Sequence, residues 1–359
     1  MEILKEFLRG HPWLYSLVYK ARFFFSPTRF LARVFIQWRH RIHRSITTVM
    51  AGPGYLGYDG GVYNPGAIIH NSIGLILLAK GQTCHWYDAV GSKADLYCKG
   101  APIFFKLNQS LNITSSYGIK SIKQFPNLDR VGFEDFRLFK YKEEIWVNHS
   151  MIPLVKKNDC VWTFRSAIPC LSHLEEDLNT LTFLGHPQLD IPLNSIEKNW
   201  VYLEDNFELY LFYSFSPYRV LKLVDRRNLR FSTVVNCPLK GKLTDIGGVG
   251  TMISYSTNPI EYDEQYWLLL VHQIKQSRIE RIYYHWGVLV DKKTLLPHKI
   301  TEKFLFSGLG ARGRKPGIVY VSSVIKQDEN FIFFMGEGDT YITRASLTKQ
   351  ALDQMWCNV

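Results

Sequence analysis

The residues with the clearest chemical potential lie at positions 132–137, which read Gly-Phe-Glu-Asp-Phe-Arg just before a predicted strand. Two carboxylates, Glu134 and Asp135, stand beside the guanidinium of Arg137. Because side chains alternate along a strand, Glu134 and Asp135 should point to opposite sides, one into a pocket and the other toward Arg137. A carboxylic acid beside a sugar can protonate a departing glycosidic oxygen, which is general-acid catalysis. The alternative is an ordinary surface turn that contains an ion pair.

A second polar cluster, Glu-Lys-Asn-Trp at residues 197–200, precedes another predicted strand. Lys198 could contact a phosphate or a negatively charged leaving group as a point charge. Asn199 can hold a sugar hydroxyl as both donor and acceptor, and Trp200 could offer a flat stacking face. The alternative is an exposed loop before a strand.

Three further groups stand at the ends of predicted strands. They are Asn64 in Asn-Pro-Gly at 64–66, the glycine pair 247–248 with His272, and Asp339 in Gly-Glu-Gly-Asp-Thr at 336–340. A lone histidine at a strand end is more often a structural residue than a ligand. Residues 310–315 are glycine-rich and basic, but they lack the P-loop spacing and precede no helix. We interpret them as a flexible basic loop.

Strands are the elements that must position these residues. After a breaker-rich linker at 52–61, short β-type runs with turn signals dominate, and helical periodicity is limited to residues 171–178 and a short turn at 349–355. A polar or glycine cluster, a strand, a turn and a second strand recur at residues 63–78, 132–149, 197–215, 247–272 and 320–335. These units predict an all-β fold, a five-bladed β-propeller over residues 51–359. A pair of β-sandwiches is the structural alternative.

Residues 1–50 differ in character and are predicted to form a basic, amphipathic helical segment. Residues 1–44 hold nine Lys or Arg against two acidic residues, which is most of the formal net charge of +11. Such a helix can lie in the headgroup region of an anionic leaflet, so we predict that residues 1–45 bind a membrane surface. A helical collar on the catalytic domain and a nucleic-acid-binding arm are the alternatives. Since the rest of the chain offers no motif that reads nucleic acid, we expect no nucleic-acid partner.

The six cysteines form no CxxC pair and show no metal-ligand spacing. The start of the chain lacks a signal-peptide pattern, and no uncharged apolar run reaches the roughly 20 residues that span a bilayer. We therefore expect reduced thiols, no metal or other cofactor, and a cytoplasmic protein that is peripheral at the inner face of the membrane.

Taken together, these clusters resemble the five-bladed propeller family of β-1,2-mannoside phosphorylases and hydrolases, with its related β-1,2-mannosyltransferases. Residues 134–137 are similar to the family's Glu-Asp-Pro-Arg motif, with Phe136 in place of proline. Five other segments resemble family motifs in the family's order: 63–67, 198–199, 267–272, 284–291 and 334–345. The resemblance covers about residues 60–350 and implies the propeller fold.

The resemblance also implies roles for the candidate residues. Asp135 would be the acid/base that protonates the bridging oxygen. The substrate-binding set would be Asn64, Arg137 and Asp339 around the sugar, Lys198 and His272 facing the phosphate or leaving group, and Glu134 and Asn199 beside them. The mechanism would be a single-displacement inversion without a covalent enzyme intermediate.

One departure from the family affects the predicted reaction. The phosphorylases carry a His-Arg pair where this sequence reads Phe-Tyr-Ser at 212–214, and Arg219 could substitute for the missing arginine. This loss and the basic N-terminal segment favour an inverting glycosyltransferase, with mannose as the expected sugar, that builds a surface polysaccharide or lipid-linked glycan. Its partners would be a sugar nucleotide or sugar 1-phosphate donor and a glycan acceptor that could be lipid-linked. A β-mannoside phosphorylase or hydrolase and a non-catalytic glycan-binding propeller remain the alternatives.

Overall fold

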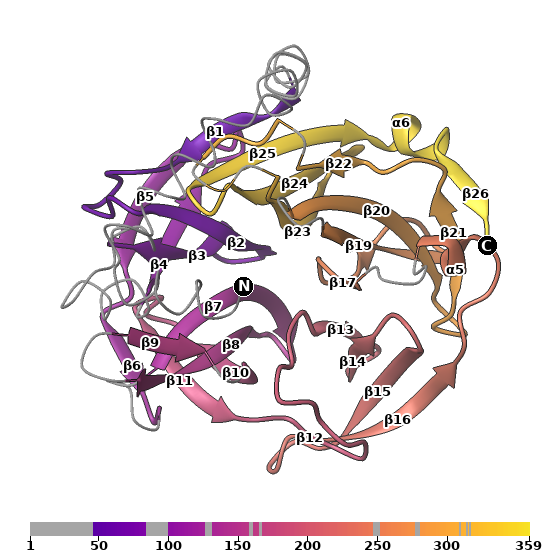
Figure 1. Ribbon diagram of the computed structural model, residues 1–359, viewed down its shortest axis with the longest axis horizontal. Coiled ribbons are helices and arrows are strands. Elements are labelled where there is room, and N and C mark those ends of the chain that lie inside the picture. The colour runs from indigo at the N-terminus through magenta and orange to yellow at the C-terminus, as the bar shows by residue number, and fades with distance from the viewer. Residues whose placement is uncertain are drawn as a thin grey trace, which may run out of the picture.

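The computed structural model describes residues 46–83, 100–125, 131–157, 161–164, 167–246, 252–276, 281–308, 310–313, 315 and 317–359. These residues form five β-sheets that surround a common centre (Figure 1). The predicted helical segment 1–45 and the glycine pair 247–248 lie outside the described residues, so the predictions made for them stay predictions. None of the helices in the described ranges is long and apolar enough to span a bilayer.

The sheets follow one another in chain order, and the first two come from the N-terminal part of the described chain. The first sheet consists of β2 (Gly61–His70), β3 (Gly74–Gln82), β4 (Ala101–Leu107) and β5 (Ile113–Gly118). The second consists of β6 (Ser121–Lys123), β7 (Val131–Tyr141), β8 (Glu144–Lys157), β9 (Val161–Phe164), β10 (Ile168–Leu174) and β11 (Thr180–Gly185).

The other three sheets complete the circle. The third consists of β12 (Gln188–Leu189), β13 (Val201–Asp205), β14 (Glu208–Ser214), β15 (Tyr218–Asp225) and β16 (Arg230–Cys237). The fourth consists of β17 (Met252–Tyr255), β18 (Ile260–Glu261), β19 (Tyr266–Gln276), β20 (Arg281–Asp291), β21 (Pro297–Thr301), β22 (Phe306–Ser307) and β26 (Trp356–Asn358). The fifth consists of β23 (Val319–Gln327), β24 (Asn330–Glu337), β25 (Tyr341–Thr348) and β1 (Thr48–Ala51). Two short helices, α5 (Lys242–Ile246) and α6 (Lys349–Asp353), lie between strands.

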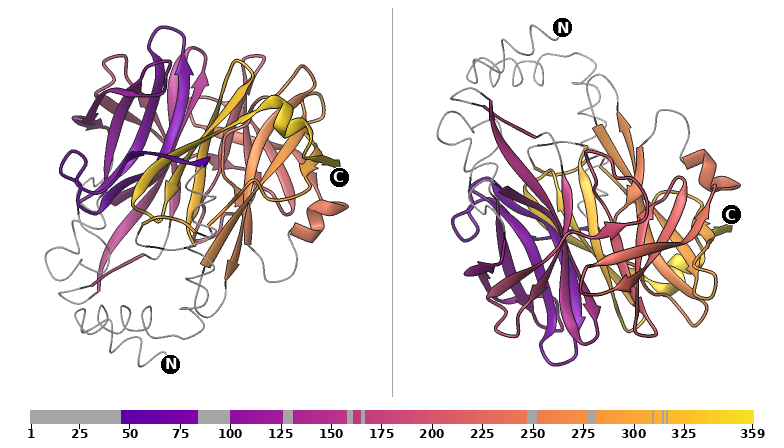
Figure 2. Two further views of the ribbon diagram at one scale, coloured as in Figure 1. Left: turned by 90° about the horizontal axis from the view of Figure 1, so that it is seen from above. Right: turned by 90° about the horizontal axis from the view of Figure 1, so that it is seen from below.

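The hydrophobic core is divided among the spaces between neighbouring sheets. One cluster joins the first and second sheets, for example through Leu78 and Val147. Further clusters join the second sheet to the third, the third to the fourth, the fourth to the fifth, and the fifth back to the first. Each sheet is therefore buried on both faces, which explains why β3 reads as an almost continuous apolar run. Figure 2 shows the ring edge-on, from above and from below the view of Figure 1.

Sheets arranged in a ring, with a core between every neighbouring pair, are what a β-propeller requires, and the all-β, propeller-like prediction is confirmed. The ring closes where β1, the first described strand, pairs antiparallel with β25 at the outer edge of the fifth sheet. A pair of sandwiches has no core that returns from the last sheet to the first, so that alternative is wrong.

Three local expectations can be compared with the structure. The turn predicted at 349–355 contains α6, whose N-cap Thr348 accepts a hydrogen bond from the Ala351 amide at 3.1 Å. The helical prediction for residues 171–178 is wrong, because residues up to Leu174 belong to β10 and the following residues form a turn rather than a helix. That strand pairs with β8 and β11 and is buried on both faces, so its apolar positions show no period of two. Residues 48–50, assigned to the helical segment, lie in β1.

Candidate active site

A pocket of about 760 Å³ is lined by residues on or next to β2, β7, β13, β17 and β23, each of which lies at one end of its sheet. Seven of the eight predicted site residues line it: Asn64, Glu134, Asp135, Lys198, Asn199, His272 and Asp339. The eighth, Arg137, lies directly beneath the pocket and is 1 % exposed. The sequence clusters therefore converge on one place, although they come from all five sheets or the loops that precede them.

Two β-bulges direct the central polar residues into this pocket. The register of β2 shifts between Tyr63 and Gly66, and that of β7 shifts between Glu134 and Arg137. Within these bulges Asn64 has φ 52° and Asp135 has φ 59°, both in the left-handed region that Asn and Asp tolerate best. The expectation that Glu134 and Asp135 point to opposite sides is wrong, because the bulge interrupts the alternation and both residues line the pocket.

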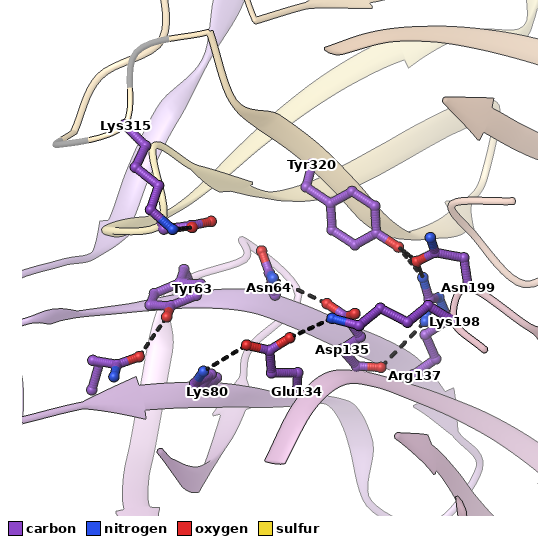
Figure 3. A network of polar contacts seen from close by, with 12 residues as sticks. Tyr63, Asn64, Lys80, Glu134, Asp135, Arg137, Lys198, Asn199, Lys315 and Tyr320 are labelled. Atoms are coloured by element: carbon purple, nitrogen blue, oxygen red, sulfur yellow. Dashed lines mark hydrogen bonds and ion pairs between the residues drawn. The ribbon is translucent and has the colours of Figure 1, made fainter. Parts of the chain in front are cut away.

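Asn64 is the direct partner of Asp135, since its Nδ2 donates to Asp135 Oδ1 at 3.2 Å (Figure 3). The backbone around Asn64 is held by close packing. A Cβ on Gly336 would lie 2.0 Å from Asn64 Oδ1. The next carbonyl, that of Pro65, accepts hydrogen bonds from Ser322 Oγ at 2.7 Å and Ser323 Oγ at 2.8 Å. The amide that faces Asp135 is thus fixed by the neighbouring fifth sheet.

Arg137 supports Asp135 from below. Its Nη1 donates to the Asp135 carbonyl at 3.3 Å, and its Nε donates to the Ser256 carbonyl at 2.9 Å. Its Nη2 donates to Asn199 Oδ1 at 3.2 Å and to Tyr320 Oη, and Tyr320 in turn donates to Asn199 Oδ1 at 2.7 Å. All three guanidinium nitrogens therefore bind protein groups, so Arg137 positions the floor of the pocket.

Glu134 lies between two lysines. Its Oε1 is 3.2 Å from Lys80 Nζ and its Oε2 is 2.7 Å from Lys198 Nζ. Burial would raise the pKa of Glu134, but the charges of Lys198 and Lys80 outweigh burial and hold that pKa well below its ordinary value. For Lys198, burial lowers the pKa, but Glu134 and Asp135 outweigh it and the pKa is raised. Both groups are therefore charged across the physiological range.

The other predicted ligands have partners of their own. Asp339, at φ 49° in the turn after β24, forms an ion pair of 2.6 Å with Lys315 Nζ. His272 lies flat against the Tyr283 ring, with 5.5 Å between centroids, and its Nδ1 is 2.9 Å from Ser256 Oγ. Burial, together with the charge of Arg137, lowers the pKa of His272 to about 3. A neutral His272 can hydrogen-bond to a phosphate but brings no charge to it.

The carboxylates of the pocket differ in what binds them. Glu134 is held by two ammonium groups, and Asp339 by one. Glu197 accepts from Tyr213 Oη at 2.9 Å and from Trp200 Nε1 at 3.2 Å. In the part of the chain that the structure describes, Asp135 is the pocket carboxylate held by neither an ammonium nor a hydroxyl, with only the Asn64 amide on its side chain. This leaves Asp135 the group best placed to exchange a proton with a ligand.

Cations gather around the same pocket. Besides Lys198 and Lys315, it is lined by Arg219 and Arg281. Arg219, the residue considered as a substitute for the missing family arginine, donates to Asn236 Oδ1 at 3.2 Å and faces the pocket from β15. This arrangement can bind a ligand that carries phosphate groups.

Two residues of this region differ from their sequence-based predictions, and a third carries no such prediction. Trp200 is 1 % exposed and packs in the core between the second and third sheets, so its predicted role as a stacking face is wrong. Lys315 was interpreted as part of a flexible basic loop, yet it pairs with Asp339. Lys80 belongs to none of the predicted clusters, although a lysine within the apolar run of β3 is a usable signal of a buried ion pair. Among the described residues, no group of three or more His, Cys, Asp or Glu could hold a metal ion.

Comparisons with known proteins identify the fold. Neither a family model nor a curated protein sequence matches the chain. Among solved structures, a β-1,2-mannobiose phosphorylase from Listeria innocua aligns with a TM-score of 0.59 and 13 % identity, covering 85 % of this chain and 96 % of that one.

Two proteins from Leishmania mexicana align similarly. MPT-1, a GDP-Man-dependent mannosyltransferase, has a TM-score of 0.57 and 12 % identity, with 84 % of this chain and 88 % of that chain covered. MPT-4, a mannose phosphorylase in complex with phosphate, has a TM-score of 0.55, also at 12 % identity and the same coverage. The resemblance inferred from the sequence motifs is therefore confirmed at the level of the fold.

Proposed function

We propose that the protein is a mannoside-active enzyme, and specifically an inverting glycosyltransferase that uses Asp135 as its acid/base. The observation that carries the proposal is the position of Asp135, on a bulge at the pocket floor, with only the Asn64 amide bound to its carboxylate. A carboxylate with unoccupied lone pairs in a polar pocket can take a proton from a sugar hydroxyl or return one. The phosphorylase and transferase activities of the structures with this fold make mannose the expected sugar.

The reaction would be a single displacement. Asp135 takes the proton of an acceptor hydroxyl, whose oxygen attacks C1 of the donor sugar. The bond from C1 to the donor's phosphate oxygen breaks, and the phosphate leaves with the electron pair. Lys198, Arg219 and Arg281 line the same pocket and supply positive charge for that leaving group. Inversion follows because the acceptor attacks directly, and the carboxylate of Glu134, held by two lysines, is poorly placed to act as a nucleophile.

A β-mannoside phosphorylase is the second candidate, and the same cations favour it. Free phosphate could occupy the cationic part of the pocket and attack C1, while Asp135 protonates the departing sugar oxygen. A hydrolase would use water in place of phosphate and has no need of the cations. The loss of the family's His-Arg pair at 212–214 still favours the transferase.

Further parts of the proposal concern the surroundings of the enzyme. We place the catalytic domain at residues 51–359 and assign residues 1–45 to the inner face of a membrane, where they would bring the pocket to a glycan acceptor that could be lipid-linked. The basic and apolar composition of residues 1–45 supports this. Vesicle flotation of the full chain and of a chain that begins at residue 46, with anionic and neutral lipids, tests the assignment.

The experiment for the function compares wild type and Asp135→Asn on sugar nucleotides, mannose 1-phosphate and β-manno-oligosaccharides, with products followed by mass spectrometry. Extension of an acceptor by wild type alone supports the transferase. Phosphate-dependent breakdown of the oligosaccharides would identify the protein as a phosphorylase. Phosphate-independent breakdown would identify it as a hydrolase. Binding of glycans by both proteins without any turnover would leave a non-catalytic glycan-binding propeller.

A further inference from the structure

A buried lysine outside the predicted site is connected to the pocket through Glu134. Lys80 lies on β3, the second strand of the first sheet, and its side chain is 4 % exposed. Its stem is confined, since a Cβ on Gly100 would lie 2.5 Å from Lys80 Cε. Its ammonium lies 5.7 Å from the centroid of the Tyr63 ring. Packing therefore fixes the point from which Lys80 reaches Glu134.

The contact between Lys80 and Glu134 is the first step of a chain across three parts of the ring. Lys80 Nζ is 3.2 Å from Glu134 Oε1, and Glu134 belongs to β7 of the second sheet. The other oxygen, Oε2, is 2.7 Å from Lys198 Nζ, and Lys198 stands in the segment that leads into β13 of the third sheet. Each carboxylate oxygen thus binds one ammonium, and the orientation of the carboxylate is set from both sides (Figure 3).

The two lysines differ in their access to the pocket. Lys198 lines the pocket and its side chain is 32 % exposed, whereas Lys80 is buried and does not line it. A lysine side chain has four rotatable bonds, so without a fixed partner the Lys198 ammonium would sample many positions. The Glu134 carboxylate is anchored by Lys80, so it restricts the Lys198 ammonium to one position in the pocket wall. This position is close enough to Asp135 for the charge of Asp135 to act on Lys198.

We propose that Lys80 is a positioning residue: acting through Glu134, it holds the Lys198 ammonium in place to bind the anionic phosphate group of the substrate. The inference rests on the proposed function only in taking the substrate to be a phosphorylated sugar. Lys80 itself touches no ligand, and its effect on binding passes entirely through Lys198.

The experiment is a double-mutant cycle of Lys80→Met and Lys198→Met, read by calorimetric titration of inorganic phosphate and of inorganic pyrophosphate into the full chain at fixed salt. We expect Lys80→Met to weaken the affinity for at least one of these probes by roughly 3- to 30-fold in the wild-type background. In the Lys198→Met background the same change should alter affinity less than about twofold. Lys80→Gln, which keeps a polar group at the site, repeats the test if Lys80→Met folds poorly. Lys292→Met removes an ion pair with Glu261 outside the pocket and is the matched control.

Equal losses of affinity in both backgrounds would overturn the inference, as would a lower melting temperature with unchanged affinity. Failure of the wild type to bind either probe would overturn it too. Because the titration needs no turnover, it is separate from the test of the proposed function. An enzyme without transferase activity can still show the coupling, and an active transferase can lack it.

Discussion

Asn64 and Asp135 face each other from two β-bulges on neighbouring sheets, with 3.2 Å between Asn64 Nδ2 and Asp135 Oδ1 and left-handed backbone at both residues. On regular strands, alternation would turn one residue of each consecutive pair, Tyr63/Asn64 and Glu134/Asp135, away from the pocket, whereas the bulges let both residues of each pair line it. The hydrogen bond between Asn64 and Asp135 therefore depends on both β-bulges. It is the basis of the first three predictions.

Asp135→Asn should abolish turnover while the fold is kept. General acid–base catalysis contributes roughly 10²- to 10⁴-fold, so we expect kcat to fall by about three orders of magnitude. Asn tolerates the φ of 59° at this position, and the melting temperature should stay close to that of the wild type. Turnover within a few fold of the wild type would remove Asp135 from the mechanism.

The amide of Asn64 can be separated from its backbone by two substitutions. Asn64→Gly keeps the left-handed backbone without strain but removes the donor to Asp135, and we expect kcat/KM to fall roughly tenfold to a hundredfold with little change in stability. Asn64→Ala removes the same donor but keeps a Cβ at φ 52°, where Ala is less tolerated than Asn or Gly, so it should melt at a lower temperature than Asn64→Gly. Equal melting temperatures for the pair, measured by calorimetry, would mean that the bulge is not under tension.

Gly336 is expected to be intolerant of any side chain. A Cβ there would lie 2.0 Å from Asn64 Oδ1 and 2.8 Å from Asn64 N, so Gly336→Ala must displace the bulge. We expect a loss of about 1–3 kcal/mol in the free energy of unfolding, together with lower activity. Gly118→Ala is the control, since its Cβ would meet only the Tyr58 hydroxyl at 3.7 Å. Urea unfolding of both variants checks the prediction, and similar stabilities for the two would contradict it.

Acid should destabilise the protein through its buried histidines. Burial lowers the pKa of His272 to about 3, with a contribution from Arg137, so between about pH 6.5 and pH 3 the unfolded chain binds a proton at this position that the folded protein does not. The stabilisation is complete above pH 6.5 and is lost as the pH falls. The loss amounts to about 2 kcal/mol at pH 5 for one such group, relative to neutral pH. His272→Gln should reduce the difference in unfolding free energy between pH 7 and pH 5 by about this amount, and a substitution of the partly exposed His70 serves for comparison. An unchanged pH dependence in His272→Gln would refute this account.

The fold and the site residues can be predicted from the sequence only where a residue's type and neighbours indicate its role. Polar groups next to glycine at strand ends are conspicuous in a sequence, and this feature marks Asp135, Asn64 and Asp339 as candidate site residues. The recurrence of strand pairs along the chain predicts the ring of sheets. The bulges were not foreseen, because an extra residue in a strand has no signature in hydrophobic alternation. The sequence does not distinguish Tyr320 from Trp200, because both are aromatic residues near the start of a strand. In the structure, Tyr320 lines the pocket and Trp200 is buried in the core.

The pairing of β1 with β25 has a consequence for how the protein is made. The fifth sheet lacks its outer strand until segments from opposite ends of the described chain meet, and the core shared by the first and fifth sheets also joins residues from both ends. Such distant contacts slow folding, since the entropy of closing the loop is lost before they form. During synthesis on the ribosome, the face of the first sheet that packs against the fifth therefore stays uncovered until the fifth sheet has been made, while its other face can already pack against the second sheet. The pocket needs Asn64 from the first sheet and Tyr320 and Asp339 from the fifth, so it is complete only after these parts of the fifth sheet have been synthesised.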